Sequence, residues 1–128
     1  MEYLQQDVLL FFASHRAALP LYDAFERKLL AMFPETGIQV KKTCISFSNR
    51  NAYAYVSFQR VKKKADLPDP YIVITLGMPY PLESDRAAVK TQPYPGRWTT
   101  HIVIGSVEDV DDELCSWLQQ AYLFAGSK

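Results

Sequence analysis

Five side chains of this 128-residue chain have the chemistry of a small-molecule site. Tyrosine rings stack on planar groups, lysine and arginine recognise anions, and an imidazole exchanges hydrogen bonds and protons near neutral pH. Together these groups predict binding of a small anionic or aromatic ligand and assign no catalytic residue. The candidate ligand-binding residues are Lys42, Tyr53, Tyr55, Arg97 and His101.

An alternative is a small enzyme that uses His101 as a general base and Cys44 as its nucleophile. The chain has no HExxH, CxxC or GxSxG pattern and no glycine-rich phosphate loop, so only strand parity supports this pair. Cys44 and Cys115 lack metal-ligand spacing, and we expect two reduced thiols. Because His15 and His101 are far apart in the sequence, we expect no metal and no cofactor.

Length and composition predict a single globular domain, residues 1–128. With 48% hydrophobic and 22% charged residues, such a chain buries about two thirds of its unfolded surface. The apolar run VLLFFA near the start is too short to span a membrane, and it lacks the basic residues that begin a signal peptide. We therefore expect a cytoplasmic protein that does not bind membranes.

The net charge of zero conceals a division along the chain. Residues 36–65 contain seven basic residues and no acidic one, whereas residues 106–113 contain five acidic residues and no basic one. Such a separation can steer an anionic partner towards the basic segment. A solvated rim combined with an acidic helix start is the alternative explanation.

Helices are predicted near both ends of the chain. In HRAALPLYDAFERKLLAMFP, apolar residues recur every three or four positions from Leu21 to Phe33, and Pro34 ends the helix. A short helix or turn precedes this segment. The second helix is expected after a capping box formed by Ser106 and Asp109, and it continues almost to the end of the chain.

Between the helices, four segments alternate with a period of two and predict strands at 38–48, 51–61, 70–77 and 98–105. Successive strand side chains point to opposite sides, so one face collects aliphatic and aromatic residues for a core. The other face is mixed and collects Lys42, Cys44, Ser46, Tyr53, Tyr55, Ser57, Tyr71, Val73, Thr75, Thr99, His101 and Val103. The predicted fold is α+β, a four-stranded antiparallel β-meander with N- and C-terminal helices packed on one face.

Two segments of this predicted sheet are irregular. Ile38 and Val40 have the opposite parity from Ile45 and Phe47, so a β-bulge near residues 41–43 or burial of the first pair elsewhere is needed. The loop 77–97 is long and contains four prolines. We expect it to fold over the open face and complete the ligand site, although its acidic residues could instead pair with its arginines at the surface.

Two macromolecular partners are also consistent with the predicted open face. Tyrosines on a sheet with lysines and arginines around them could stack on the bases of single-stranded nucleic acid. The zero net charge and the absence of an RNA-recognition signature argue against this partner. Alternatively, a second copy of the chain could cover the face and form a homodimer.

Four segments carry a resemblance to a known family: FFASHRAALPLYDAF, VKKTCISFSNRNAYAYVSF, ITLGMPYPLES and PYPGRWTTHIVIGSVEDVDDELCSWLQQAYLFA. Through them the chain resembles a bacterial family known only as domain of unknown function 5655. The resemblance implies a small bacterial domain that also occurs at the end of longer chains, and it implies no known reaction. A weaker similarity in element order links the chain to YdhG-like small proteins, which as fold analogy carries no function.

Overall fold

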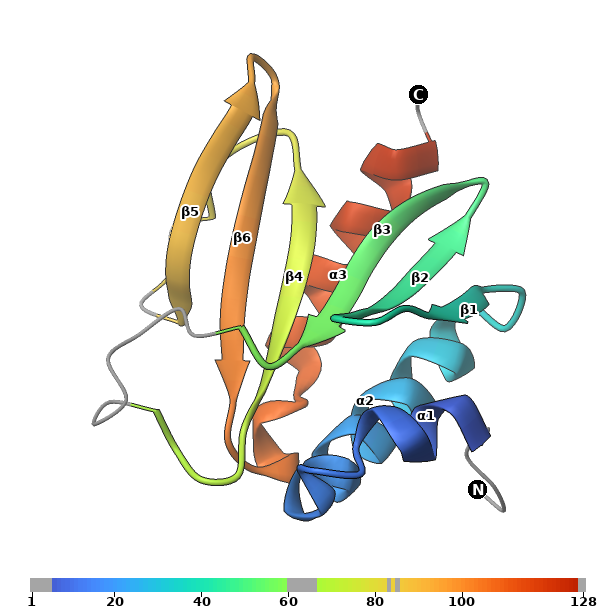
Figure 1. Cartoon of the computed structure of the whole chain (residues 1–128). Coiled ribbons are helices and arrows are strands. Elements are labelled where there is room, and N and C mark those ends of the chain that lie inside the picture. The colour runs from blue at the N-terminus through green and yellow to red at the C-terminus, as the bar shows by residue number, and fades with distance from the viewer. Residues whose placement is uncertain (1–5, 60–66, 83, 85, 127–128) are drawn as a thin grey trace.

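The structure is a computed structural model that describes residues 6–59, 67–82, 84 and 86–126, and only the backbone of residues 87–91, 93 and 94. Its helices are α1 (Gln6–Phe11), α2 (Leu19–Met32) and α3 (Asp112–Gly126), with 3-10 turns η1 (Arg16–Ala18) and η3 (Val107–Asp109). Its strands, shown in Figure 1, are β1 (Gly37–Val40), β2 (Ile45–Asn49), β3 (Asn51–Ser57), β4 (Ile72–Met78), β5 (Ala87–Tyr94) and β6 (Arg97–Ile104).

The six strands form one sheet in the order β1-β2-β3-β4-β6-β5, and every neighbouring pair is antiparallel. The predicted α+β class is confirmed. The predicted four-stranded meander is wrong, because the segment 38–48 is a hairpin and the loop 77–97 contains a strand. The order also departs from a meander, since β5 lies outside β6 and not between β4 and β6.

The hairpin β1–β2 explains the conflict in strand parity. The chain reverses at residues 41–44, where the Lys41 N–H donates to the Cys44 carbonyl oxygen at 2.8 Å. Ile38 then lies opposite Phe47, on the same side of the sheet. No bulge is needed at residues 41–43, and the loop brings the side chain of Lys42 to the open face.

The connection from β4 to β5 lies on the helix-covered face. Both strands run antiparallel to β6, so the chain must return from one end of the sheet to the other between Met78 and Ala87. Leu82 of this connection is buried in the core, and the Arg86 guanidinium contacts the start of α3. In Figure 1 the connection passes behind β6. The expectation that this segment covers the open face is therefore wrong.

The helix ends follow local sequence rules. Pro20 lies in the first turn of α2, where a missing N–H costs nothing. Ser106 and Asp109 form the predicted capping box, but it caps the start of the 3-10 turn η3. Helix α3 begins after this turn, at Asp112. None of the helices in the described ranges is long and apolar enough to cross a membrane.

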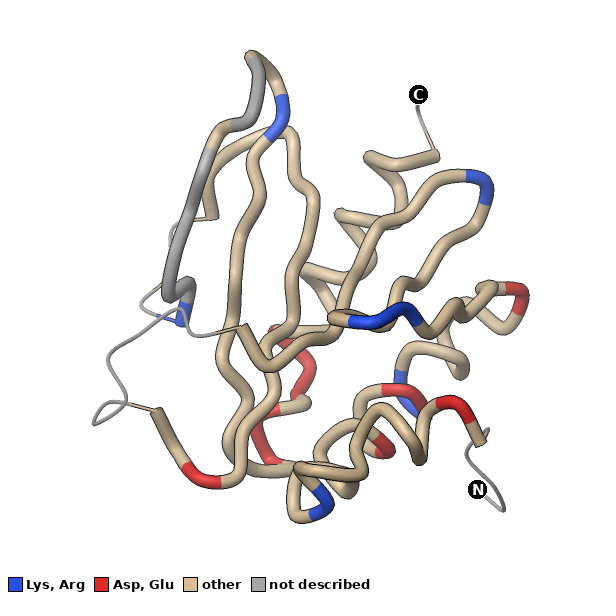
Figure 2. Tube along the Cα trace, in the orientation of Figure 1, with Lys and Arg blue, Asp and Glu red and all other residues tan. Residues whose placement is uncertain are grey.

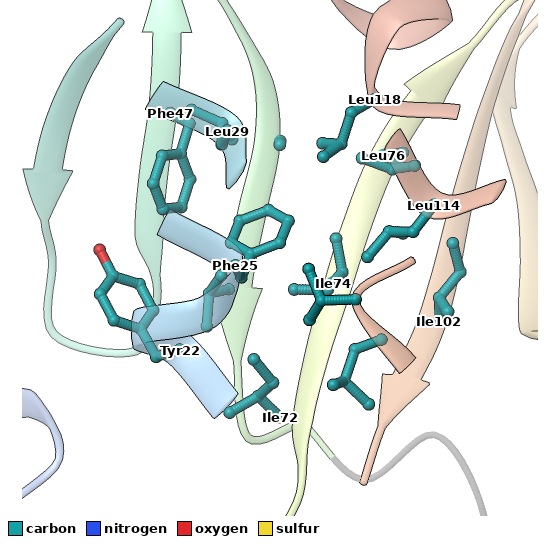
Figure 3. Packing of buried hydrophobic residues seen from close by; sticks show 14 of the residues in the cluster. Tyr22, Phe25, Leu29, Phe47, Ile72, Ile74, Leu76, Ile102, Leu114 and Leu118 are labelled. Carbon is teal, nitrogen blue, oxygen red and sulfur yellow. The ribbon is translucent and has the colours of Figure 1, made fainter. Parts of the chain in front are cut away.

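The core lies between the sheet and the two long helices. Figure 3 shows side chains of α2, such as Phe25, and of α3, such as Leu114, pointing into one layer with Ile74 and Leu76 of β4. The rings of Phe25 and Phe47 meet edge to face at 5.5 Å. Each large side chain buried here contributes about 1.5–3 kcal/mol, which holds α2 and α3 on this face.

Tyr53 lies on the helix-covered face and not, as predicted, on the open one. The register of β2 and β3 shifts by one residue, because Phe47 pairs with Ala54 whereas Ser48 pairs with Ala52. Tyr53 is therefore the extra residue of a β-bulge, which turns its side chain to the other side of the strand.

The environment of Tyr53 is that of a core residue. Its side chain is 1% exposed, and its ring packs edge-on against Phe33 and Tyr122. The hydroxyl lies 2.7 Å from the Thr36 Oγ1. Burial raises the pKa of Tyr53 to about 12, so the phenol stays protonated and serves the fold.

Candidate functional site

The open face of the sheet contains a hollow of about 710 Å³. Figure 1 views the sheet from this side, with α3 behind the strands. Residues from α1, the following turn, the β1–β2 loop and strands β3, β4 and β6 line it. They are Leu10, Phe11, Ser14, His15, Lys42, Thr43, Cys44, Tyr55, Ser57, Phe58, Gln59, Thr75 and His101.

A row of polar side chains runs across the strands that form its floor. In the sheet register Ser46 lies opposite Tyr55, Tyr55 opposite Thr75, and Thr75 opposite His101. Directly opposed residues have Cβ atoms about 4.5–5.5 Å apart, so their side chains can act together on one bound molecule. The antiparallel pairing thus assembles a row that is scattered over 56 positions of the sequence, from residue 46 to residue 101.

His101 is the most sheltered titratable group of the floor. Its side chain is 9% exposed, and its Nδ1 lies 2.8 Å from the Thr75 Oγ1. Burial lowers the pKa of His101 below its usual 6.5, so the imidazole is neutral at pH 7. Because Thr75 occupies Nδ1, Nε2 is the ring nitrogen left for a ligand.

One wall of the hollow is aromatic. The rings of His15 and Phe58 stack at 3.9 Å with an angle of 13° between their planes, and Phe11 stacks on Phe58 at 5.4 Å. His15 is nevertheless exposed. His15 is not among the five predicted ligand-binding residues, although the motif FFASHR places it three residues after Phe12.

The β1–β2 loop supplies three further lining residues, Lys42, Thr43 and Cys44. Lys42 is exposed and makes no ion pair with any described residue, while Asp7 shares a smaller neighbouring hollow with Lys41 and Lys42. Cys44 is a half-buried free thiol, as is Cys115 in α3. Lys42 therefore brings to the hollow a positive charge that no ion pair with a described residue neutralises.

The structure brings three of the five predicted ligand-binding residues together. Lys42, Tyr55 and His101 line the hollow, whereas Tyr53 belongs to the core. Arg97 is on the open face, but it lies four residues from His101 along β6, which is roughly 13 Å of strand. Its guanidinium covers the backbone of Gly77 and does not line the hollow.

Arg86, in the loop expected to complete the site, is tied to the start of α3 instead. Its guanidinium donates to Asp111 and Glu113, each at 3.0 Å, and to the Asp109 carbonyl oxygen at 2.6 Å. It also lies 5.4 Å from the ring centre of Trp117. Although burial opposes it, the hydrogen bond from the Leu114 N–H and the guanidinium lower the pKa of Asp111. This arginine stabilises the fold on the helix side.

The acidic cluster and the described basic residues of the β1–β2 loop lie apart in the fold. In Figure 2 the acidic residues at the start of α3 lie behind the strands, and the basic β1–β2 loop lies beside the end of β3. Of the seven basic residues in 36–65, Lys41, Lys42 and Arg50 are described, and the other four lie outside the described residues. Among described side chains, no group of three His, Cys, Asp or Glu residues is placed to hold a metal ion.

The family comparison covers most of the chain. The profile of the family described as Domain of unknown function (DUF5655) matches residues 10–125. The chain belongs to this family. No curated protein and no solved structure matches it with significance, so the similarity to YdhG-like proteins has no support. All residues that line the hollow fall within the matched range of the DUF5655 domain.

The position of Tyr53 bears on nucleic acid as a possible partner. With Tyr53 in the core, Tyr55 is the one of the two candidate stacking tyrosines that stays on the open face of the DUF5655 domain. A platform for unpaired bases needs successive aromatic side chains, so this weakens the interpretation as a nucleic-acid module. The homodimer remains a prediction.

Proposed function

We propose that this domain is a non-catalytic binding module for a small anionic or aromatic ligand, held in the hollow on the open face. The observation that carries the proposal is convergence. The β1–β2 loop supplies Lys42, β3 supplies Tyr55 and β6 supplies His101, and all three line one hollow. A concave site with aromatic walls and a few convergent polar groups is the usual form of a small-molecule site.

The residues that line the hollow are partly held in place before a ligand binds. The His101 ring is held by Thr75, which orients the imidazole before a ligand arrives. Holding the ring in place lowers the entropic cost of binding, so a small ligand can be recognised with few contacts. No reaction has to be assumed for this role.

The proposal is tested by titrating the ¹⁵N-labelled protein with a library of small aromatic and anionic compounds. Compounds that bind are expected to shift the backbone resonances of Tyr55, Thr75 and His101 together. The variant Tyr55→Phe should weaken the binding of these compounds. Tyr80 is exposed and does not line the hollow, so Tyr80→Phe should leave their binding unchanged. If the compounds that bind shift residues elsewhere only, the proposed site is wrong.

A second candidate function is a thiol enzyme, and one observation favours it. Cys44 and His101 line the same hollow, as a nucleophile and its base must. In an activated pair, Cys44 would react with iodoacetamide at neutral pH much faster than a model thiol, and His101→Gln would remove the difference. A Cys44 that reacts as slowly as a model thiol in both proteins rejects the enzyme.

A further inference from the structure

We propose, on the basis of the binding function above, that the ligand is aromatic and anionic at once and lies in one orientation. Its planar ring would lie against the wall formed by Phe11, His15 and Phe58, which we call the aromatic wall. Its anionic group would point towards Lys42, Tyr55 and His101, which we call the donor end. The ligand class is therefore an aryl carboxylate or a similar ring with one acidic group.

The aromatic wall provides the surface for a ring. The ring of Phe58 lies within 18° of parallel to the ring of Phe11 and within 13° of parallel to that of His15. The three rings are therefore aligned with one another. Phe58 is held from behind by the ring of Phe12, which meets it edge-on at 5.2 Å and is 1% exposed. A wall supported in this way keeps its shape when a ligand stacks on it, and His15 remains exposed to receive one.

The donor end can give hydrogen bonds in several directions. The Lys42 ammonium carries three donors, and the Tyr55 hydroxyl carries one. Ser57 Oγ accepts a bond from the Gln59 N–H at 3.3 Å, which leaves its own hydroxyl proton for a ligand. Among the described residues that line the hollow there is no carboxylate, and Asp7 lines the neighbouring hollow. The hydroxyls of the hollow can accept as well as donate, but the formal charge that Lys42 brings to its described lining is positive and favours an anion.

His101 joins the donor end through its neighbour. When the Thr75 hydroxyl donates to Nδ1, the proton of the neutral imidazole is on Nε2, where it can be given to an anion. Thr75 can rotate its hydroxyl to select this tautomer. A neutral ring can thus donate to an acidic group without first taking up a proton.

The test compares four probes that separate ring from charge: benzoate, acetate, benzyl alcohol and benzylamine. Each is titrated into the ¹⁵N-labelled 128-residue chain, and the shifts of Tyr55 and His101 are followed. Benzoate is expected to bind about tenfold more tightly than acetate or benzyl alcohol, because only benzoate uses both ends. Benzylamine, with the same ring and the opposite charge, should bind most weakly.

Two variants identify the ends, and each has a neighbour as its control. Lys42→Gln should weaken benzoate about fivefold and leave benzyl alcohol unchanged, whereas Lys41→Gln, next to it but outside the hollow, should have no effect. His15→Ala should weaken benzoate and benzyl alcohol equally and leave acetate unchanged. Its control is Arg16→Ala, an exposed neighbour that does not line the hollow.

The outcomes separate this proposal from the binding function on which it rests. If benzylamine or benzyl alcohol binds as tightly as benzoate at these residues, the hollow is a binding site and the requirement for an anion is wrong. If Lys42→Gln and Lys41→Gln weaken benzoate binding equally, the two positive charges attract the anion without a specific contact, and the assigned orientation is wrong. If none of the four probes shifts Tyr55 or His101, both proposals are rejected.

Discussion

The two faces of the sheet are both sheltered, yet they shelter different chemistry. On the helix-covered face the buried strand residues are apolar or aromatic, with Thr100 as the exception. On the open face Val73 is accompanied by four buried polar residues, Ser46, Ser57, Thr75 and His101. A sheltered polar group lowers stability unless it finds a partner. One face is therefore organised for packing, and the other keeps groups that can bind.

The largest expected effect contrasts neighbours in β4 that point to opposite faces. Leu76 is fully buried under α3, so Leu76→Ala should lower the free energy of unfolding by about 3 kcal/mol. Thr75→Val, on the open face, removes one hydrogen bond and should cost about 1 kcal/mol. Urea denaturation measures both values. Equal losses would show that the two faces do not differ as described.

Next in size is a contrast between two arginines of the segment 77–97. Arg86→Gln removes the bonds to Asp111, Glu113 and the Asp109 carbonyl, and it should cost about 1.5 kcal/mol, since the carboxylates are partly exposed. Arg97 makes no hydrogen bond or ion pair with described residues, so Arg97→Gln should cost about 0.3 kcal/mol or less. Thermal unfolding of both variants checks the difference, and a reversed order would contradict the assignment of Arg86 to the fold.

The third contrast concerns the two tyrosines of β3. Tyr53→Phe leaves the Thr36 hydroxyl without its partner in a part-buried site and should cost about 1 kcal/mol. Tyr55→Phe should leave the free energy of unfolding nearly unchanged and should weaken ligand binding. Chemical denaturation of each variant is compared with its benzoate affinity. A stable Tyr53→Phe protein together with a destabilised Tyr55→Phe protein would contradict the assignment of the bulge to Tyr53.

The smallest expected effect is a pH dependence of the stability that comes from His101 on the open face. Burial lowers the pKa of His101 below 6.5, so in the window between the folded and unfolded values the unfolded chain binds more protons. The contribution of His101 to stability is therefore complete above about pH 6.5 and is lost as the pH falls through the folded pKa. Melting temperatures measured from about pH 8 to pH 5 should fall more steeply for the wild type than for His101→Gln. Parallel curves would mean that His101 is not sheltered.

Much of the fold could be predicted from the sequence, because periodic patterns dominate in its long elements. The stripe around Phe25 in α2 and the alternation in β4 are each reinforced by several residues. The hairpin at residues 41–44 was missed because a four-residue loop within an apolar segment looks like a continuous strand with one defect. Strand β5 was missed because it has few large apolar residues and contains Pro93, which is tolerated at the edge of a sheet.

The candidate site was predicted in part. Parity correctly placed Tyr55 and His101 on one face, because each belongs to a regular strand. Parity failed at Tyr53, since alternating Ala and Tyr residues give no sign of a bulge. It could not find His15, because the contact of this residue with Phe58 joins segments 43 positions apart and depends on the path of the chain after α1.

The bulge at Tyr53 means that β3 carries one residue more than β2 opposite it. Since strand faces alternate at every position, deleting Ala52 would straighten the strand, pair Tyr53 with Ser48 and move its phenol to the ligand side beside the β2–β3 turn. A homologous chain one residue shorter here would present different groups to its ligand with every other position intact. Changes in length, which no point substitution reproduces, are thus a route by which such domains could acquire new ligands.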